Sequence, residues 1–454
     1  MRPEKSSKAS FRAYVPLIFG IACWAYLTYV IRNPWLPSLA YAILVWQIVE
    51  FLAMLGTYVG IFNVITLLAA GQWVCIPVIT NDFLGTNIMA VKEEDYLSFV
   101  IPGFFMLYLG INWFKGRWLG TERMLIAKAS KQLAATPNLG LYLFFIGFLG
   151  GLTESIVPLQ FRFFIYLLHQ LMFVGAIYTI LSPAKNKLLV VGFVILLTLS
   201  EVAATGMFGE FIFWTGLMII VLGVNFRIPL FIKLLIFSIG VFLIFVIQVV
   251  KWEFRAQTWE KEVDNKGEIL ASVFFEKLSN PESLMSPDAI YGLLERGNMG
   301  FHIGKTLKHV PQYEPFAGGE TILVATVGAL IPRFIWSDKP KAGGSEMMRR
   351  FAGYKVRGTT SMDIGHLAEG YANFGKTGGW IYIFFYGLFW SWLFYKLMQK
   401  AIEYPTLIFW LPFIFIQAIK VETDLNSVLN PTIKSIFFVW LVFSASKRFF
   451  KVNL

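Results

Sequence analysis

Apolar runs of about 20 residues recur along almost the whole chain, and they limit the fold more than any other feature. A run of this length can cross the hydrocarbon core of a bilayer as an α-helix. Because lipid offers no hydrogen-bond partners, each run must satisfy its own backbone N–H and C=O groups. The predicted spans are residues 13–31, 37–56, 58–80, 97–114, 139–157, 163–182, 188–206, 210–226, 229–250, 379–398, 404–420 and 431–446. The sequence therefore predicts an all-α, polytopic integral membrane protein with about twelve transmembrane helices.

The composition supports the same class. Hydrophobic residues make up 57% of the chain and charged residues only 15%, which is more apolar surface than a soluble protein of 454 residues can bury. The basic N-terminal stretch MRPEKSSKASFR leads into the first run without a small-residue cleavage site, so we expect a retained anchor rather than a removed signal peptide. Cys23 and Cys75 fall inside predicted spans and indicate neither a disulfide nor a metal site.

The distribution of Lys and Arg predicts the orientation. Eighteen basic residues fall in the tails and short connections on one side of the predicted spans, and five fall in the short connections on the other. Since cytoplasmic loops are enriched in Lys and Arg, both termini are expected in the cytoplasm. The net charge of +11 comes mostly from this face. Its scatter among short loops favours contact with anionic membrane lipids and argues against nucleic-acid binding.

The spans divide the chain into three parts. Residues 1–250 are expected to form an N-terminal bundle of about nine helices, and residues 379–454 a C-terminal bundle of about three. Between them, residues 251–378 form one large external loop that holds sixteen of the 39 basic and fifteen of the 28 acidic residues. The apolar run 320–332 within this loop is too short to span alone. A crossing there would also invert the charge pattern of every later segment, so we predict a partly inserted or re-entrant helix.

The large loop is expected to be folded. In SPDAIYGLLERG, Ser286 suits a helix N-cap, Pro287 suits the first turn, and Gly297 suits the position after the helix end. We therefore predict short helices within the loop.

Basic and polar side chains in this loop indicate a phosphate-binding surface beside the membrane. Arg presents a rigid fork that binds phosphate in a bidentate manner and keeps its charge, which suits a lipid-linked phosphate or diphosphate. In DIGHLAEGY, His366, Glu369 and Tyr371 lie within one or two turns of each other if the stretch is helical. Apolar Ile364 and Leu367 would seat this helix against the protein and turn the polar groups toward one cavity.

Ionisable residues near the predicted external mouth of the spans are further candidates, because such residues are costly in a membrane. Glu201 and Glu210 flank one connection, and Glu154 and Arg162 bracket another. They could line the same cavity. Aromatic residues of the loop, including Trp336, could stack on sugars.

Three motifs in the loop resemble one known family. PFAGGET, IPRFIWSDKPKAGG and EGYANFGKTGG, followed by a last group of helices, are similar to the bacterial O-antigen polymerase (Wzy-type) oligosaccharide repeat-unit polymerases. The resemblance implies a multi-pass protein of the bacterial inner membrane whose active site faces the periplasm. Its substrates would be undecaprenyl diphosphate-linked oligosaccharides: the growing glycan moves from the lipid diphosphate to the non-reducing end of a lipid-linked repeat unit. A chain-length regulator protein is the implied partner.

The resemblance also implies roles for the candidate residues. A sugar leaving a diphosphate needs cationic stabilisation and a base for the incoming hydroxyl, with inversion and without metal or cofactor. Glu369 is the first candidate base, His366 the second and Asp338 the third. An Arg followed after ten residues by a Gly is a pattern of such loops, and Arg333 with Gly344 fits it. The expected catalytic and substrate-binding set is Glu369, His366, Arg333, Arg349, Arg350, Lys339, Lys341, Arg296, Tyr371, Trp336, Arg162 and Glu201.

Two other functions are compatible with this sequence. An O-antigen ligase would use the same donor and a lipid A core acceptor. A transporter or flippase of lipid-linked oligosaccharides would also be basic, aromatic and polytopic. The folded loop favours an enzyme, and the lack of a repeat between the two halves argues against the common transporter folds.

Overall fold

The computed structural model describes residues 7–85, 88–153, 156–158, 161–185, 187–226, 228–258, 265–284, 286–331, 335–336, 339, 344–356 and 362–450. In this part of the chain all regular structure is helical, as predicted from the apolar runs.

The helices of the first half are α1 (Ser7–Ala25), α2 (Trp35–Met54), α3 (Ile61–Ala69), α4 (Ile76–Leu84), α5 (Glu93–Asn112), α6 (Lys115–Trp118), α7 (Glu122–Ala135), α8 (Leu139–Thr153), α9 (Arg162–His169), α10 (Leu171–Leu181), α11 (Lys187–Thr205) and α12 (Gly209–Gly223). Those of the second half are α13 (Leu230–Thr258), α14 (Lys266–Ser279), α15 (Pro281–Leu284), α16 (Pro287–Gly297), α17 (Gly300–His309), α18 (Glu320–Leu330), α19 (Ser345–Phe351), α20 (His366–Glu403), α21 (Leu411–Phe415) and α22 (Leu425–Ala445). Short π-helical turns cover Tyr26–Val30, Ala70–Cys75 and Ser446–Phe450, and a 3₁₀-helix covers Pro405–Trp410.

Within the described ranges, eight helical stretches are long and apolar enough to cross a membrane: Trp35–Met54, Ile61–Leu84, Glu93–Trp118, Arg162–Leu181, Lys187–Thr205, Leu230–Thr258, His366–Glu403 and Leu425–Arg448. Each coincides with a predicted span. A ninth is α7 with α8, if this pair, bent by 88°, crosses as one unit. The helices Tyr14–Val30, Gly209–Gly223 and Pro405–Phe415 lie at predicted spans but are shorter. The chain is thus a helical protein of membrane type, and the number twelve stays a prediction.

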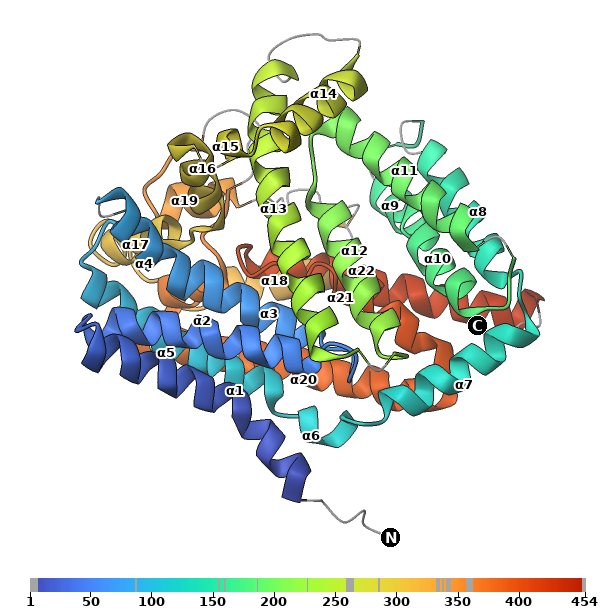
Figure 1. The fold of residues 1–454 in the computed structure, drawn as a ribbon, viewed down its shortest axis with the longest axis horizontal. Helices are drawn as coiled ribbons and strands as arrows, with labels where there is room; N and C mark the ends of the chain where they lie inside the picture. Colours follow the sequence, from blue (N-terminus) through green and yellow to red (C-terminus); the bar gives the residue numbers. More distant parts are fainter. Residues whose placement is uncertain are drawn as a thin grey trace.

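The long helices run in two main directions. Figure 1 shows α1, α2, α5 and α20 lengthwise along the molecule, whereas α12 and α13 run steeply across them. A single membrane normal can therefore be parallel to at most one of these groups. Helices α5 and α20 approach closely, because a Cβ atom on Gly110 would lie 2.2 Å from the carbonyl oxygen of Phe384. Small residues allow such close approach of helices in membranes.

Helix α20 is broken near its start. Gly375 has φ 70° and ψ −167°, a conformation essentially restricted to glycine, so the helix reverses there instead of continuing. The first arm, 366–374, folds back on the second arm, 376–403. A Cβ atom on Gly370 would lie 3.2 Å from the Cα atom of Gly379, and the two arms are therefore in backbone contact.

Two predicted elements of the large loop are present as helices. Helix α16 begins where expected, since the Ser286 side chain accepts a hydrogen bond from Ala289 N, although Gly297 is its last residue rather than the one that follows. The run predicted at 320–332 forms α18, which packs against α22 and α20. Its packing on the last long helix brings the large loop onto the C-terminal bundle.

Candidate functional site

The segments that carry two of the motifs are joined to each other. Residues 317–319 run beside the end of the first arm of α20: Ala317 N donates to Ala372 O at 2.9 Å, and Gly318 N donates to Asn373 O at 3.0 Å. Gly319 N also donates to the Asn373 side-chain oxygen at 3.0 Å. These bonds fix the PFAGGET segment to the EGYANFG segment.

Glu369 lies at the centre of this junction between residues 315–321 and residues 369–375. Its side chain is buried, with 1% of the residue exposed. Oε1 accepts from the Thr321 hydroxyl at 2.9 Å, and Oε2 accepts from Leu425 N at 2.8 Å. Asn373 Nδ2 donates to the same Thr321 hydroxyl at 2.8 Å. Glu369 thus connects the start of α18, the first arm of α20 and the first residue of α22.

Two further buried carboxylates adjoin it. Asp363 Oδ2 accepts from Asp424 N at 3.0 Å, and Asp424 caps α22 by accepting from Ser427 N at 2.6 Å. Burial, and then the charge of Asp424, raises the pKa of Asp363 well above its ordinary value, and burial raises the pKa of Asp424. Gly344, at the end of the IPRFIWSDKPKAGG motif, touches this group, because a Cβ there would lie 2.3 Å from the Asp363 carboxyl carbon. All three motif segments therefore meet at one place.

His366 contacts another residue of α20. It is fully buried, and its Nε2 lies 2.8 Å from the Tyr386 hydroxyl on the second arm. Ile364 and Leu367 are buried as predicted, and the stretch is helical as predicted. The two side chains bond to different partners: His366 lies against Tyr386, whereas Glu369 binds Thr321 and Leu425 N, and both residues are buried. This geometry favours a positioning role for both residues over proton transfer to a substrate.

Arg350 and Arg349 are neighbours in α19 with different surroundings. Arg350 makes a bidentate pair with Glu320, with two bonds of 2.9 Å, and also binds Glu314 at 2.6 Å. The hydrogen bonds from Arg350 lower the pKa of Glu320. Arg349 has a side chain 69% exposed and lies 3.9 Å from Glu346 of the same helix. Arg349 is thus open to a ligand, whereas Arg350 is held by two carboxylates.

The other candidates of the loop occupy varied positions. Lys339 is buried and donates to Ile331 O at 3.3 Å, at the end of α18. Tyr371 donates to Val310 O at 3.0 Å, and Trp336 is partly exposed. The remaining ones lie outside what the structure describes: Arg333, Asp338 and Lys341 entirely, and Arg296 of α16 for its side chain.

The candidates of the first bundle lie in a different cluster. His169 Nε2 and a Glu201 oxygen are 2.7 Å apart, and Arg162 is exposed at the start of α9. Gln170 donates to Glu210 at 3.0 Å, and Glu154 lies outside the described residues. No hydrogen bond or ion pair among the residues described links Arg162 or Glu201 to Glu369. The structure therefore does not join these residues to the junction in the loop.

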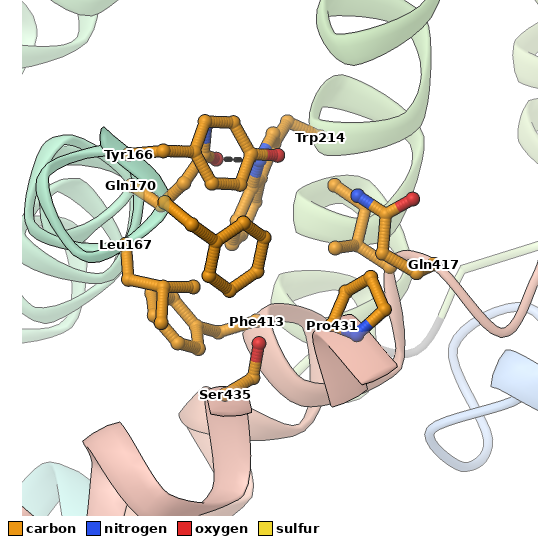
Figure 2. A pocket seen from close by; sticks show the side chains of 10 residues that line it. Tyr166, Leu167, Gln170, Trp214, Phe413, Gln417, Pro431 and Ser435 are labelled. Carbon is orange, nitrogen blue, oxygen red and sulfur yellow. Dashed lines mark hydrogen bonds between the residues drawn. The ribbon is translucent and has the colours of Figure 1, made fainter. Parts of the chain in front are cut away.

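A small cavity lies beside this second cluster. Figure 2 shows Tyr166, Gln170 and Trp214 on one side of it and Phe413, Gln417 and Ser435 on the other. Its volume is about 10 Å³, which admits about one water molecule and no sugar.

Metal ligation has no site in the described ranges, where no group of three or more His, Cys, Asp or Glu side chains is arranged to hold an ion.

Sequence reasoning missed four members of the junction: Asp363, Thr321, Asn373 and Asp424. Two of them, Asp363 and Asn373, carried a signal, because they recur with His366 and Glu369 at intervals of three or four residues, as on one helix face. Thr321 carried none, since its bond to Glu369 depends on the packing of a distant segment.

The profile of one protein family, described as a domain of unknown function (DUF8712), matches residues 82–443. No curated protein and no solved structure matches the chain.

Proposed function

Because the chain belongs to the DUF8712 family, whose description states no activity, we propose a function from its own residues: it polymerises lipid-linked oligosaccharide repeat units. The growing glycan would move from an undecaprenyl diphosphate to the non-reducing end of a lipid-linked repeat unit. The reaction would take place at the periplasmic face of the bacterial inner membrane.

The observation that carries the proposal is the meeting of the three motifs that resemble the polymerases. Thr321 and Glu369 join the first to the third, and Gly344 brings the second against Asp363. Segments that lie up to about 50 residues apart in sequence thereby form one unit around buried carboxylates. A site assembled from these motifs is what the proposed reaction requires.

The outer surface of this unit carries suitable groups for a glycan diphosphate. Arg349 is exposed, and Lys376 is exposed with a single bond of 2.9 Å to the Ser98 hydroxyl. Tyr313 and Phe316 are exposed by 68% and 43%, and aromatic rings of this kind can stack on sugars. Exposed cations and exposed aromatic rings in these segments suit a ligand that is part phosphate and part sugar.

The residues would divide the chemistry between them. The acceptor hydroxyl oxygen attacks the anomeric carbon, the bond from that carbon to the diphosphate breaks, and the hydroxyl proton passes to a base. Arg349, with Arg333, would stabilise the charge on the leaving diphosphate. Glu369 and His366 would hold the motifs in place. The base would then be another carboxylate: Asp338, the third candidate from the sequence, or Glu320, whose side chain is 54% exposed.

Contacts between chain segments support the proposed sidedness. Arg123 and Lys233, both assigned to the cytoplasmic face, contact the end of α2 at Gly56 and Ala53, which is assigned to the same face. Lys376 and Ser98, both assigned to the external face, are hydrogen-bonded.

A transporter of lipid-linked oligosaccharides is the second candidate, and one observation favours it. Broken helices beside buried ionisable groups are typical of ion-coupled transporters, and α20 breaks at Gly375 close to Glu369. A ligase with the same donor remains the third.

Purified protein in proteoliposomes, supplied with lipid-linked repeat units isolated from cells that lack it, tests the proposal. We expect a ladder of products, its loss in Arg333→Ala at normal protein abundance, and weak recovery in Arg333→Lys, because a point charge cannot replace the bidentate fork. In a parallel assay that also contains lipid A core, attachment of the glycan to this core would instead indicate a ligase. Movement of the repeat unit across the bilayer without a ladder would indicate the transporter.

A further inference from the structure

A groove between α2, α7 and α13 brings two cations together, far along the chain from the motifs. It has a volume of about 440 Å³ and is lined by Leu55, Gly56, Thr57, Arg123, Ile228, Pro229 and Lys233. Arg123 Nη2 donates to Gly56 O at 2.8 Å, and Lys233 Nζ donates to Ala53 O at 3.3 Å. Both basic side chains thus lie at the C-terminal end of α2.

The two cations are left without an acidic partner in the part of the chain that the structure describes, where no ion pair includes Arg123 or Lys233. Like charges held close together repel, so an anion between them would be favoured. Each side chain uses one donor on a carbonyl, of Ala53 in the last turn of α2 or of Gly56 just after it. Guanidinium and ammonium groups have five and three N–H donors. Several donors therefore remain for the oxygens of a ligand.

The walls of the groove favour a lipid over a free ion. Leu55, Ile228 and Pro229 are apolar, and the groove opens beside the first turns of α13. Leu230 and Phe231, in these turns, are exposed by 65% and 73%. A phosphate near a membrane surface with apolar helix below it matches a phospholipid, whose chains would lie along α13.

We propose that this groove binds one anionic phospholipid, with its phosphate on Arg123 and Lys233 and its acyl chains on the exposed face of α13. The site is independent of the polymerase proposal, because none of its residues belongs to the motifs. Under the charge assignment, it lies on the cytoplasmic side.

Thermal unfolding of the full-length protein in detergent tests the site, with phosphatidylglycerol, phosphatidylcholine and inorganic phosphate as the three probes. A ligand that binds only the folded state raises the melting temperature. We expect phosphatidylglycerol to raise it, to remain bound at about one molecule per chain, and to bind about tenfold or more weakly to the Arg123→Gln/Lys233→Gln variant. Lys128→Gln, which removes an exposed cation of the same helix α7, should bind like the wild type.

Three results would overturn the proposal. Equal stabilisation by inorganic phosphate would identify a free anion as the ligand. Equal stabilisation by phosphatidylcholine would remove the requirement for an anionic lipid. If the double variant melts at a lower temperature but still responds fully to phosphatidylglycerol, the two residues only stabilise the end of α2 and do not bind the lipid. If the double variant does not accumulate, Lys233→Met, which keeps the length of the side chain and removes the charge, gives the same comparison.

Discussion

The Tyr386 hydroxyl lies 2.8 Å from Nε2 of His366, although the two residues are 20 positions apart in one helical stretch. In a continuous α-helix, 20 residues would separate them by about 30 Å. The contact exists because the chain reverses at Gly375, so the first arm of α20 returns along the second. From this first arm, Glu369 binds both α18 and α22, and Asn373 binds α18.

Gly375→Ala should therefore damage the junction. The backbone angles at Gly375 are unfavourable for any residue with a Cβ, at a cost of about 1–3 kcal/mol. We expect a lower melting temperature and faster proteolysis of residues 310–320. Gly192→Ala is the matched control, since no atom lies within 4 Å of a Cβ there and Ala favours the helix. Equal melting temperatures for both variants would contradict the proposed importance of the reversal.

Glu369 should matter more for structure than for proton transfer. Glu369→Ala removes both acceptors and leaves Leu425 N–H buried without its bond, which costs about 1–3 kcal/mol per group. Glu369→Gln can still accept from Leu425 N and donate to the Thr321 hydroxyl. We expect the Gln variant to unfold near the wild-type temperature and to keep polymerising, and the Ala variant to do neither. A stable but inactive Gln variant would restore Glu369 as the base.

The residue pattern predicted the elements of the site better than their arrangement. The helix over His366 and Glu369, its buried Leu367 and the N-cap at Ser286 follow from spacing and capping, which act locally. The reversal at Gly375 carries no local signal, because a glycine in an apolar helix is as readily explained by close packing. The sequence alone therefore predicts that His366 and Glu369 face one cavity.

Long-range partners were not predictable for the same reason. Arg350 and Arg349 are adjacent and identical in type, yet only Arg350 meets two carboxylates, which come from residues 30 and 36 positions earlier. The number of membrane crossings was not predictable either, because length and hydropathy identify apolar helices but not their directions. Helix α13 crosses α2 at a steep angle (Figure 1), and the spacing of apolar residues does not predict this angle.

Stability should fall as the pH rises above 5. Burial raises the pKa of Asp363 well above its ordinary value of about 4, so the folded state holds this proton more tightly than the unfolded state. Unfolding then releases a proton at any pH between the two values, and stability declines through that window. Glu320 acts oppositely, since its pKa is lowered, but only below its ordinary value of about 4.3. The apparent melting temperature should decrease from pH 5 to pH 6.5 and again to pH 8. In Asp363→Asn it should decrease less steeply with pH. A rise with pH would show that the Asp363 proton is not retained.

The topology can be tested with single cysteines in a Cys23→Ala/Cys75→Ala background. Ser345 and Gln312 are exposed and assigned outside, and Ala127 is exposed and assigned inside. A maleimide that cannot cross the membrane should label cysteines at the first two positions in intact spheroplasts, and should label the third only after lysis. Labelling of Gln312→Cys together with protection of Ser345→Cys would mean that α18 crosses the membrane.

Arg349 and Arg350 provide the sharpest separation of binding from folding, because they are neighbours of the same type. Arg350→Ala removes the bidentate pair with Glu320 and the bond to Glu314, leaving two carboxylates side by side. Since these groups are partly exposed, we expect a moderate loss of stability, about 1 kcal/mol, seen as faster hydrogen exchange over residues 310–320. Arg349→Ala should leave hydrogen exchange unchanged and lower polymerisation about a hundredfold, because it removes an exposed stabiliser of the leaving diphosphate. Arg349→Lys should recover little of the rate.

If Arg349→Ala polymerises normally, the diphosphate binds elsewhere in the loop. If its exchange over 310–320 also accelerates, Arg349 shares the structural role of Arg350.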